Sequence, residues 1–185
     1  MSPEKIKILK AGGVGIIPTD TVYGIACPAF NESALKRLFD IKGRDEDKPP
    51  IVLISSLKDL ELFGVKIGKL AKIFIKKFWP GPISIIFTIK SELNYLDKGK
   101  GLAIRLPNDK KVLEFLKQTG PLATSSANFQ GLPPAKNIIE AKKYFGGKVD
   151  FYEEGGELIS LPSTLVRINK GQIEVLREGV VKVSI

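Results

Sequence analysis

Residues 18–24 read Pro18-Thr19-Asp20-Thr21-Val22-Tyr23-Gly24, and they follow a short apolar run from Val14 to Ile17. The run predicts a buried strand, and Pro18 ends it because proline has no N–H to donate to a neighbouring strand. Two hydroxyls, a carboxylate and a phenol then stand within five residues. Ligands of open α/β sheets bind at strand ends, so this polar loop is a candidate binding site. The alternative is a capped turn, in which Thr19 and Asp20 bond their own backbone.

A second group of small polar side chains follows another predicted strand, Pro121 to Ala123. The residues Thr124-Ser125-Ser126-Ala127-Asn128 come directly after it. Small side chains let a ligand approach closely, and hydroxyls both donate and accept hydrogen bonds. We therefore expect this cluster to line a ligand site as well.

Cations and a glycine crowd the junction between a predicted helix and the strand after it: Lys42, Gly43, Arg44 and Lys48. Arginine offers phosphate oxygens a planar fork, and lysine offers them a mobile point charge. Gly43 allows the backbone to come close to a ligand. The junction therefore predicts a phosphate-binding loop. Acidic residues at positions 45–47 leave a second interpretation open, a solvated loop of mixed charge.

Residues 102–107 read as a short buried strand that contains Arg105. An unpaired charge is costly inside a core, so Arg105 requires a partner. Two partners are open: a carboxylate of the protein in a structural ion pair, or the carboxylate of a substrate.

The composition limits the chemistry that the chain can perform. A length of 185 residues with 43% hydrophobic residues suits one domain, over residues 1–185. The chain has no histidine, which excludes Ser-His-Asp and Cys-His hydrolases and a histidine-based zinc site. The net charge of +9 favours anionic partners such as a nucleotide, phosphate or RNA, although a solvated surface accounts for most of the lysines.

The chain also carries signals of its cellular setting. No apolar run is long enough to cross a bilayer, and the first residues do not resemble a signal peptide. The single cysteine, Cys27, lies in an apolar setting and reads as a core residue, which fits a reducing compartment. We expect a cytoplasmic protein without a membrane contact.

Helical and extended patterns alternate irregularly, and the C-terminal part reads as a hairpin. The chain therefore predicts an α/β fold with a twisted mixed sheet and helices on its faces. The glycine fingerprint for dinucleotides and the Walker P-loop are both absent, so any nucleotide is held by another arrangement. Expected helices begin at Ser2, Asn31, Ser56, Lys66, Asn108 or Asp109, and Ala135. The helix from Lys66 should bury Ile67, Leu70, Ile73, Phe74 and Phe78. Expected strands cover 14–17, 51–54, 83–89, 102–107, 121–123, 149–152, 165–168 and 173–176.

Seven motifs in this order resemble the YrdC/Sua5 family of threonylcarbamoyl-AMP synthases, from about Ile6 to Gly179. Each motif alone is a weak signal, but seven in order with sensible spacing are strong evidence. The chain is similar to the short form of the family, which lacks an extra C-terminal domain. The motifs are Pro18 to Gly24, Lys42-Gly43-Arg44 with Lys48-Pro49, Trp79-Pro80-Gly81-Pro82, Ala103 to Pro107, Ser126-Ala127-Asn128 with Gly131, Pro162-Ser163-Thr164, and Arg177-Glu178-Gly179.

The resemblance implies a large, positively charged concave cavity and an ATP-dependent reaction. L-Threonine, bicarbonate and ATP would give L-threonylcarbamoyladenylate and pyrophosphate, with Mg²⁺ accompanying ATP and held mainly by phosphates and water. The product would pass to a threonylcarbamoyl transferase for the N6-threonylcarbamoyladenosine modification at position 37 of tRNA. A contact with tRNA itself is compatible with this function.

The resemblance also implies roles for individual residues. Lys42, Arg44, Ser126 and Asn128 would form the catalytic group. ATP would be bound by Arg44, Lys48, Thr124, Pro134 and Arg177. Threonine would be bound by Thr21, Leu53, Arg105, Ser126 and Ser163. Leu53 stands where some long-form members carry a histidine, so a backbone contact is expected there. No residue is assigned to a metal.

Two other functions compete with this one. The first is a module that binds double-stranded RNA or tRNA without adenylating activity, because the positive charge alone would suit it. The second is a carbamoyl-adenylate former like the related domain of hydrogenase maturation proteins, whose acylphosphatase-like and zinc-finger segments are missing here. Small, loop-borne polar residues and the absence of an aromatic-rich RNA motif favour the small-molecule pocket.

Overall fold

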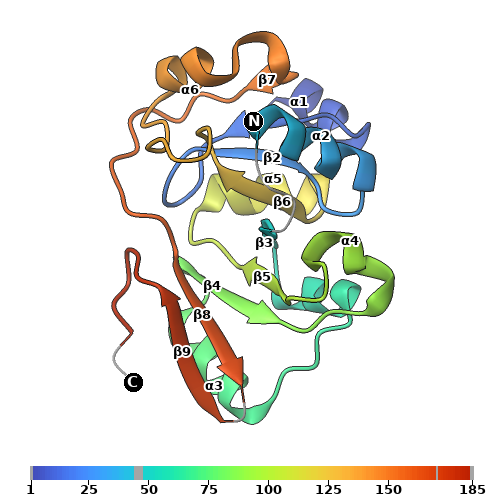
Figure 1. The fold of residues 1–185 in the computed structure, drawn as a ribbon, viewed down its shortest axis with the longest axis vertical. Helices are drawn as coiled ribbons and strands as arrows, with labels where there is room; N and C mark the ends of the chain where they lie inside the picture. Colours follow the sequence, from blue (N-terminus) through green and yellow to red (C-terminus); the bar gives the residue numbers. More distant parts are fainter. Residues whose placement is uncertain (1, 44–47, 170, 184–185) are drawn as a thin grey trace.

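The computed structural model describes residues 2–43, 48–169 and 171–183, and within them nine strands form one mixed sheet (Figure 1). The order across the sheet is β7-β1-β2-β6-β3-β5-β4-β8-β9. The strands are β1 Gly15–Ile17, β2 Gly24–Pro28, β3 Ile51–Leu53, β4 Ile83–Phe87, β5 Leu102–Arg105, β6 Leu122–Ser126, β7 Phe151–Tyr152, β8 Thr164–Asn169 and β9 Gln172–Arg177.

The sheet combines parallel and antiparallel neighbours. β1 pairs with β7 in parallel, as β3 does with β5 and β4 with β8. The other neighbouring strands run antiparallel. The predicted α/β class with a mixed sheet is therefore confirmed.

Several helices begin at the residues that the sequence suggests. Asn31 caps α2 by accepting from Ala34 N at 2.9 Å, and Asp109 caps α5 by accepting from Val112 N at 2.9 Å. Ser2 holds the cap position of α1 without a side-chain bond. No helix in the described ranges is long and apolar enough to cross a membrane. The helices are α1 Pro3–Lys10, α2 Glu32–Lys42, α3 Lys69–Phe78, α4 Asn94–Asp97, α5 Lys110–Thr119 and α6 Ile138–Phe145, with 3₁₀ turns η1 Leu57–Phe63, η2 Ser91–Leu93 and η3 Gly146–Lys148.

The two faces of the sheet carry different layers. Helices α1 and α5 pack on one face, where their side chains form a cluster with Leu53, Leu122 and Phe151. Helices α2, α3 and α6 contribute to the larger cluster on the opposite side of the strands, which includes Ile25 and Cys27. Cys27 is fully buried, as predicted, and burial raises the pKa of its thiol to about 12.

Three expectations about elements were wrong or incomplete. Strand β2 was not predicted, although it lies between β1 and β6 in the sheet. Strand β6 extends through Ser126, so part of the second hydroxyl cluster belongs to the strand itself. Ile73 of α3 is 67% exposed, and Ile75 takes its expected place in the core.

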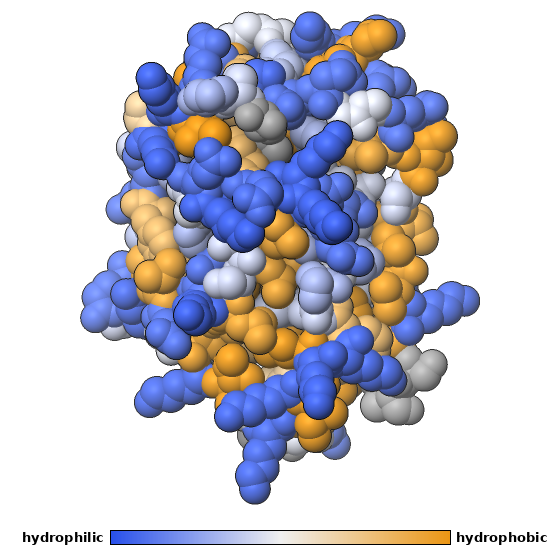
Figure 2. Space-filling view, turned by 180° about the vertical axis from the view of Figure 1, so that it is seen from behind, coloured by the Kyte–Doolittle hydropathy of each residue, from blue (hydrophilic) through white to orange (hydrophobic). Residues whose placement is uncertain are grey.

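The surface is dominated by hydrophilic side chains. The face in Figure 2 is hydrophilic over much of its area, with apolar patches between the charged side chains. On α3, Lys72, Lys76 and Lys77 are exposed. These three lysines fit the solvated-surface interpretation of much of the net charge.

Candidate active site

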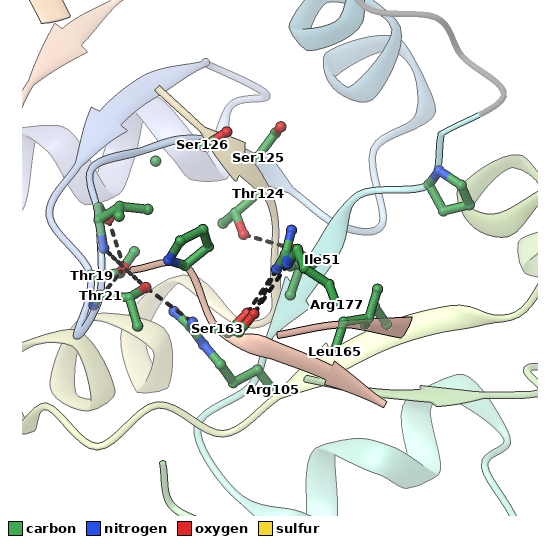
Figure 3. A pocket seen from close by; sticks show the side chains of 15 residues that line it. Thr19, Thr21, Ile51, Arg105, Thr124, Ser125, Ser126, Ser163, Leu165 and Arg177 are labelled. Carbon is green, nitrogen blue, oxygen red and sulfur yellow. Dashed lines mark hydrogen bonds between the residues drawn. The ribbon is translucent and has the colours of Figure 1, made fainter. Parts of the chain in front are cut away.

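Helices α1 and α5 cover only part of their face of the sheet, and the uncovered part holds a pocket of about 190 Å³ (Figure 3). Along β6, Leu122 lies under α5, whereas Thr124 and Ser126 reach the pocket. Along β3, Leu53 is covered in the same way and Ile51 reaches the pocket. The pocket is lined by Thr19, Thr21, Val22, Gly24, Pro49, Ile51, Ala103, Arg105, Thr124, Ser125, Ser126, Pro162, Ser163, Leu165 and Arg177.

The two hydroxyl clusters meet because β2 and β6 are neighbours. Their antiparallel register places Gly24 opposite Ser126 and Ala26 opposite Thr124. The polar loop before β2 therefore lies beside the end of β6. Both clusters line one pocket, as expected from their places at strand ends.

The polar loop before β2 contains a capped turn and also forms a wall of the pocket. Thr19 Oγ1 accepts from Thr21 N at 3.2 Å and from Val22 N at 3.3 Å, and it donates to the carbonyl of Val22 at 2.7 Å. These local bonds fix the loop. Thr19, Thr21 and Val22 also line the pocket, so the turn capped by Thr19 is part of the pocket wall. Asp20, expected to bond its own backbone, instead accepts from Asn108 N at 3.0 Å and pairs with Arg105.

Arg105 has a protein partner, Asp20. Asp20 Oδ1 lies 2.8 Å from Arg105 Nη2, and the two side chains are only 7% and 5% exposed. Arg105 Nη1 also donates to Thr21 Oγ1 at 3.1 Å. Burial lowers the pKa of Arg105, the charge of Asp20 opposes that shift, and the charge of Arg177 adds to it. The structural ion pair is thus present, and it lies at the edge of the pocket.

Arg177 and Ser163 form the opposite wall. Arg177 Nη2 donates to the carbonyl of Ser163 at 2.8 Å and to its Oγ at 3.2 Å. Ser163 Oγ also shares a hydrogen bond of 2.9 Å with Ser84 Oγ, and both serines are buried. Burial lowers the pKa of Arg177. A second guanidinium thus faces the pocket from β9 (Figure 3).

Three of the predicted catalytic residues form one hydrogen-bonded group. Lys42, at the end of α2, is 3% exposed, and its Nζ donates to the carbonyl of Ser126 and to Asn128 Oδ1, the latter at 3.3 Å. Ser126 Oγ donates to Asn128 Oδ1 at 2.6 Å. The group ties the end of β6 to the end of α2, directly before the predicted phosphate-binding loop. Gly43 follows Lys42 with a φ of 57°, which a glycine adopts without strain.

The pocket lining does not include Lys42 or Asn128, and the predicted residues Leu53, Pro134 and Lys48 also lie outside it. Leu53 is fully buried in the cluster under α5, and Pro134 is partly exposed on the segment before α6. Lys48 is exposed beside Pro49, which does line the pocket. Arg44 lies outside the described residues. The roles of all the predicted site residues stay predictions.

Ser84 had no role in the sequence-based interpretation, and Asp20 was expected only as part of the polar loop and its turn. Asp20 holds Arg105, and Ser84 supports Ser163. The signal for Ser84 was a hydroxyl inside an otherwise apolar run, because a buried hydroxyl requires a hydrogen-bond partner. The partner of Arg105 could be sought only among carboxylates near predicted strand ends, where Asp20 stands.

The described side chains do not form a ready metal site. No group of three or more cysteines, aspartates or glutamates is close enough to hold an ion in residues 2–43, 48–169 and 171–183. The buried carboxylate of Asp97 already accepts from Gly99 N and Gly101 N, at 3.0 and 3.1 Å.

Comparison with known proteins identifies the family. The family profile Sua5/YciO/YrdC, described as "Telomere recombination", matches residues 7–179. The chain belongs to the Sua5/YciO/YrdC family.

Members of the Sua5/YciO/YrdC family with assigned names resemble the chain over most of its length. A threonylcarbamoyl-AMP synthase of Coxiella burnetii is 34% identical over 157 residues, which cover 82% of this chain and 83% of that protein. The threonylcarbamoyl-AMP synthase of Pyrococcus abyssi is 34% identical over 176 residues, and the match spans about half (52%) of its length. The crystal structure of P. abyssi Sua5 complexed with L-threonine has a TM-score of 0.89 and 30% identity, covering 95% of this chain and 53% of that one.

Proposed function

We propose that this protein is a threonylcarbamoyl-AMP synthase, which makes L-threonylcarbamoyladenylate from L-threonine, bicarbonate and ATP and releases pyrophosphate. The observation that carries the proposal is one pocket lined by both hydroxyl clusters and two arginines, in a chain of this family. The relatives named above are threonylcarbamoyl-AMP synthases, and a structure of one of them contains L-threonine.

The size and chemistry of the pocket suit an amino acid. Its volume of about 190 Å³ is below the roughly 300–1,000 Å³ of pockets for larger ligands. The hydroxyls of Thr21, Ser126 and Ser163 offer hydrogen bonds to a polar side chain, and Arg105 offers donors to a carboxylate. The large basic cavity expected for ATP as well stays a prediction.

The proposed reaction depends on positioning. The threonine amine takes up bicarbonate and loses water to form a carbamate. A carbamate oxygen then attacks the α-phosphorus of ATP, and pyrophosphate leaves. An enzyme can accelerate such a reaction mainly by holding the two reactants in line and by stabilising the charge on the phosphates. The absence of histidine is therefore no obstacle.

We assign nucleotide binding to the side of the pocket at Pro49. Lys42, Arg44 and Lys48 would meet the phosphates, and Arg177 would close over the nucleotide. Thr124 is already engaged with the carbonyl of Ile51 at 2.8 Å, so it would contact ATP through its remaining hydrogen-bonding capacity. Pro134 would contribute its backbone.

We also propose the wider setting of the reaction. The product would pass to a threonylcarbamoyl transferase that modifies adenosine 37 of tRNA, in the cytoplasm. Mg²⁺ would accompany ATP.

Pyrophosphate release tests the proposal. Purified protein should release pyrophosphate only when ATP, threonine and bicarbonate are all present. Ser126→Ala should slow the release strongly, whereas Ser91→Ala, an exposed serine outside this pocket, should not. Release that is equally fast without threonine would reject the function.

A further inference from the structure

Asp20 is a buried carboxylate that the proposed chemistry does not use. It belongs to the polar loop before β2, yet it is absent from the lining of the pocket. Its Oδ2 accepts from Asn108 N at 3.0 Å, and its Oδ1 lies 2.8 Å from Arg105 Nη2. Asp20 therefore joins the polar loop before β2 to the segment after β5.

The contact with Arg105 leaves part of the guanidinium available. Asp20 Oδ1 and Arg105 Nε have no hydrogen-bond partner in the part of the chain that the structure describes, so the contact is an ion pair without the aligned two-bond fork. A guanidinium carries five N–H donors. Thr21 Oγ1 accepts from Nη1, and Asp20 Oδ1 lies beside Nη2. Donors remain for a second acceptor.

The surroundings make Asp20 the counter-charge for this arginine. Arg105 and Arg177 both line the pocket, and no acidic residue is among the described lining residues. A buried charge that loses its partner is strongly unfavourable. Without the carboxylate, Arg105 would gain from rotating toward water or from drawing water into the pocket.

We propose that Asp20 is a positioning residue, which holds the Arg105 guanidinium where its remaining N–H groups meet the carboxylate of the amino-acid substrate. This inference rests on the proposed function. Asp20 itself touches no substrate, so its removal should affect the amino acid selectively. ATP, proposed to bind at the side of the pocket at Pro49, should be affected much less.

The test compares two buried aspartates. Asp20→Asn keeps the shape and an acceptor for Asn108 N but removes the charge. Asp97→Asn is the matched control, because Asp97 is 5% exposed and satisfied by backbone donors outside this pocket. For each variant, KM for threonine, KM for ATP and the melting temperature are measured, together with threonine binding by calorimetry.

Asp20→Asn should raise KM and Kd for threonine about tenfold or more, the effect of a misplaced charged contact, and change KM for ATP less than about twofold. Asp97→Asn should lower the melting temperature and leave both KM values unchanged. If Asp20→Asn does not fold, Asp20→Glu keeps the charge on a longer stem, and its threonine Kd should still rise.

Three results would overturn the inference: an unchanged threonine Kd in the folded Asp20→Asn variant, a rise of equal size in KM for threonine and for ATP, or a normal threonine Kd in Asp20→Glu.

The calorimetric measurement separates this inference from the proposed function. A wild-type protein that binds threonine but forms no adenylate contradicts the function and still decides the role of Asp20. A wild-type protein that does not bind threonine contradicts both.

Discussion

The hydroxyl of Ser126 links two parts of the site. Ser126 lines the pocket, its Oγ donates to Asn128, and its carbonyl accepts from Lys42. Lys42 ends α2 directly before the predicted phosphate-binding loop. The group therefore connects the pocket proposed for the amino acid with the segment expected to hold phosphates. A substrate hydroxyl that reaches Ser126 would join a network that is already ordered.

Substrate choice should follow from these hydroxyls. Valine has nearly the shape of threonine but lacks its hydroxyl, so it would leave a buried polar group of the pocket without a partner. We expect kcat/KM for valine to be about 10⁴-fold lower than for threonine. Competition kinetics with the two amino acids measures the ratio, and Ser126→Ala should reduce it. Equal use of valine and threonine by the wild-type protein would reject this pocket.

The residue types at the site could be predicted from sequence better than their contacts. Thr21, Ser126, Ser163, Arg105 and Arg177 were expected at a ligand site, and all five line one pocket. Their proximity depends on strand neighbours far apart in the chain, which local patterns do not report. Leu53 shows the limit: its position along β3 places it under α5, although Ile51, two residues earlier on the same face, reaches the pocket.

At the scale of elements, a few side chains tie distant segments together around the sheet. Arg37 of α2 donates to both carboxylate oxygens of Asp150, at 2.6 and 2.8 Å. Asp150 also accepts from Val14 N at 2.7 Å, directly before β1. The hydrogen bond from Arg37 lowers the pKa of Asp150 most, burial opposes the shift, and the bond from Val14 adds to it.

This contact should make stability depend on pH. The pKa of Asp150 is lower in the folded protein than its unfolded value of 3.8. Its contribution to the stability of the fold is therefore present above pH 3.8 and is lost as the pH falls through the pKa of the folded state. Asp150→Asn should lower the free energy of unfolding at pH 7 by about 1 kcal/mol or less. This change corresponds to a fall in melting temperature of about 2–4 °C at most. Melting curves at pH 7 and pH 3 check this. A difference that persists unchanged at pH 3 would contradict the role of the charge.

Helices were easier to predict than strands for a physical reason. Capping residues such as Asn31 and Asp109 act locally, and the sequence near them shows where a helix begins. Strand β2 has no comparable local mark, because Gly24 to Pro28 gains its hydrogen bonds from β1 and β6. At the C-terminal end, a Cβ on Gly179 would collide with the backbone of Ser163 and Thr164, a close approach that only the folded chain reveals.

The whole molecule is a mixed sheet that leaves one part of a face without a helix. Residues 153–163 run along the side of the molecule from β7 to β8 without a helix or strand, and they bring Pro162 and Ser163 to the pocket (Figure 1). The net charge of +9 is compatible with either a nucleotide or RNA as partner. The effect of each ligand on the stability of the folded protein can distinguish a nucleotide-binding protein from an RNA-binding one.

ATP and threonine together should stabilise the folded protein without RNA. A ligand at a hundredfold excess over its Kd raises the free energy of unfolding by about 2.7 kcal/mol. For a chain of this size, that increase raises the melting temperature by about 5–11 °C. Binding to RNA should instead weaken steeply with salt. Thermal shifts at moderate and high salt measure both. A large shift with tRNA that survives high salt, beside none with ATP and threonine, would favour the RNA-binding module.

The most direct measurement follows carbon from bicarbonate into the adenylate. Purified protein is incubated with ATP, threonine and ¹³C-labelled bicarbonate, and the nucleotide products are separated at once and weighed by mass spectrometry. The proposed reaction predicts a threonine-dependent adenylate that carries one labelled carbon, formed together with pyrophosphate. A product set without a labelled adenylate, from protein shown to bind both ATP and threonine, would contradict the assignment of this pocket to threonylcarbamoyladenylate synthesis.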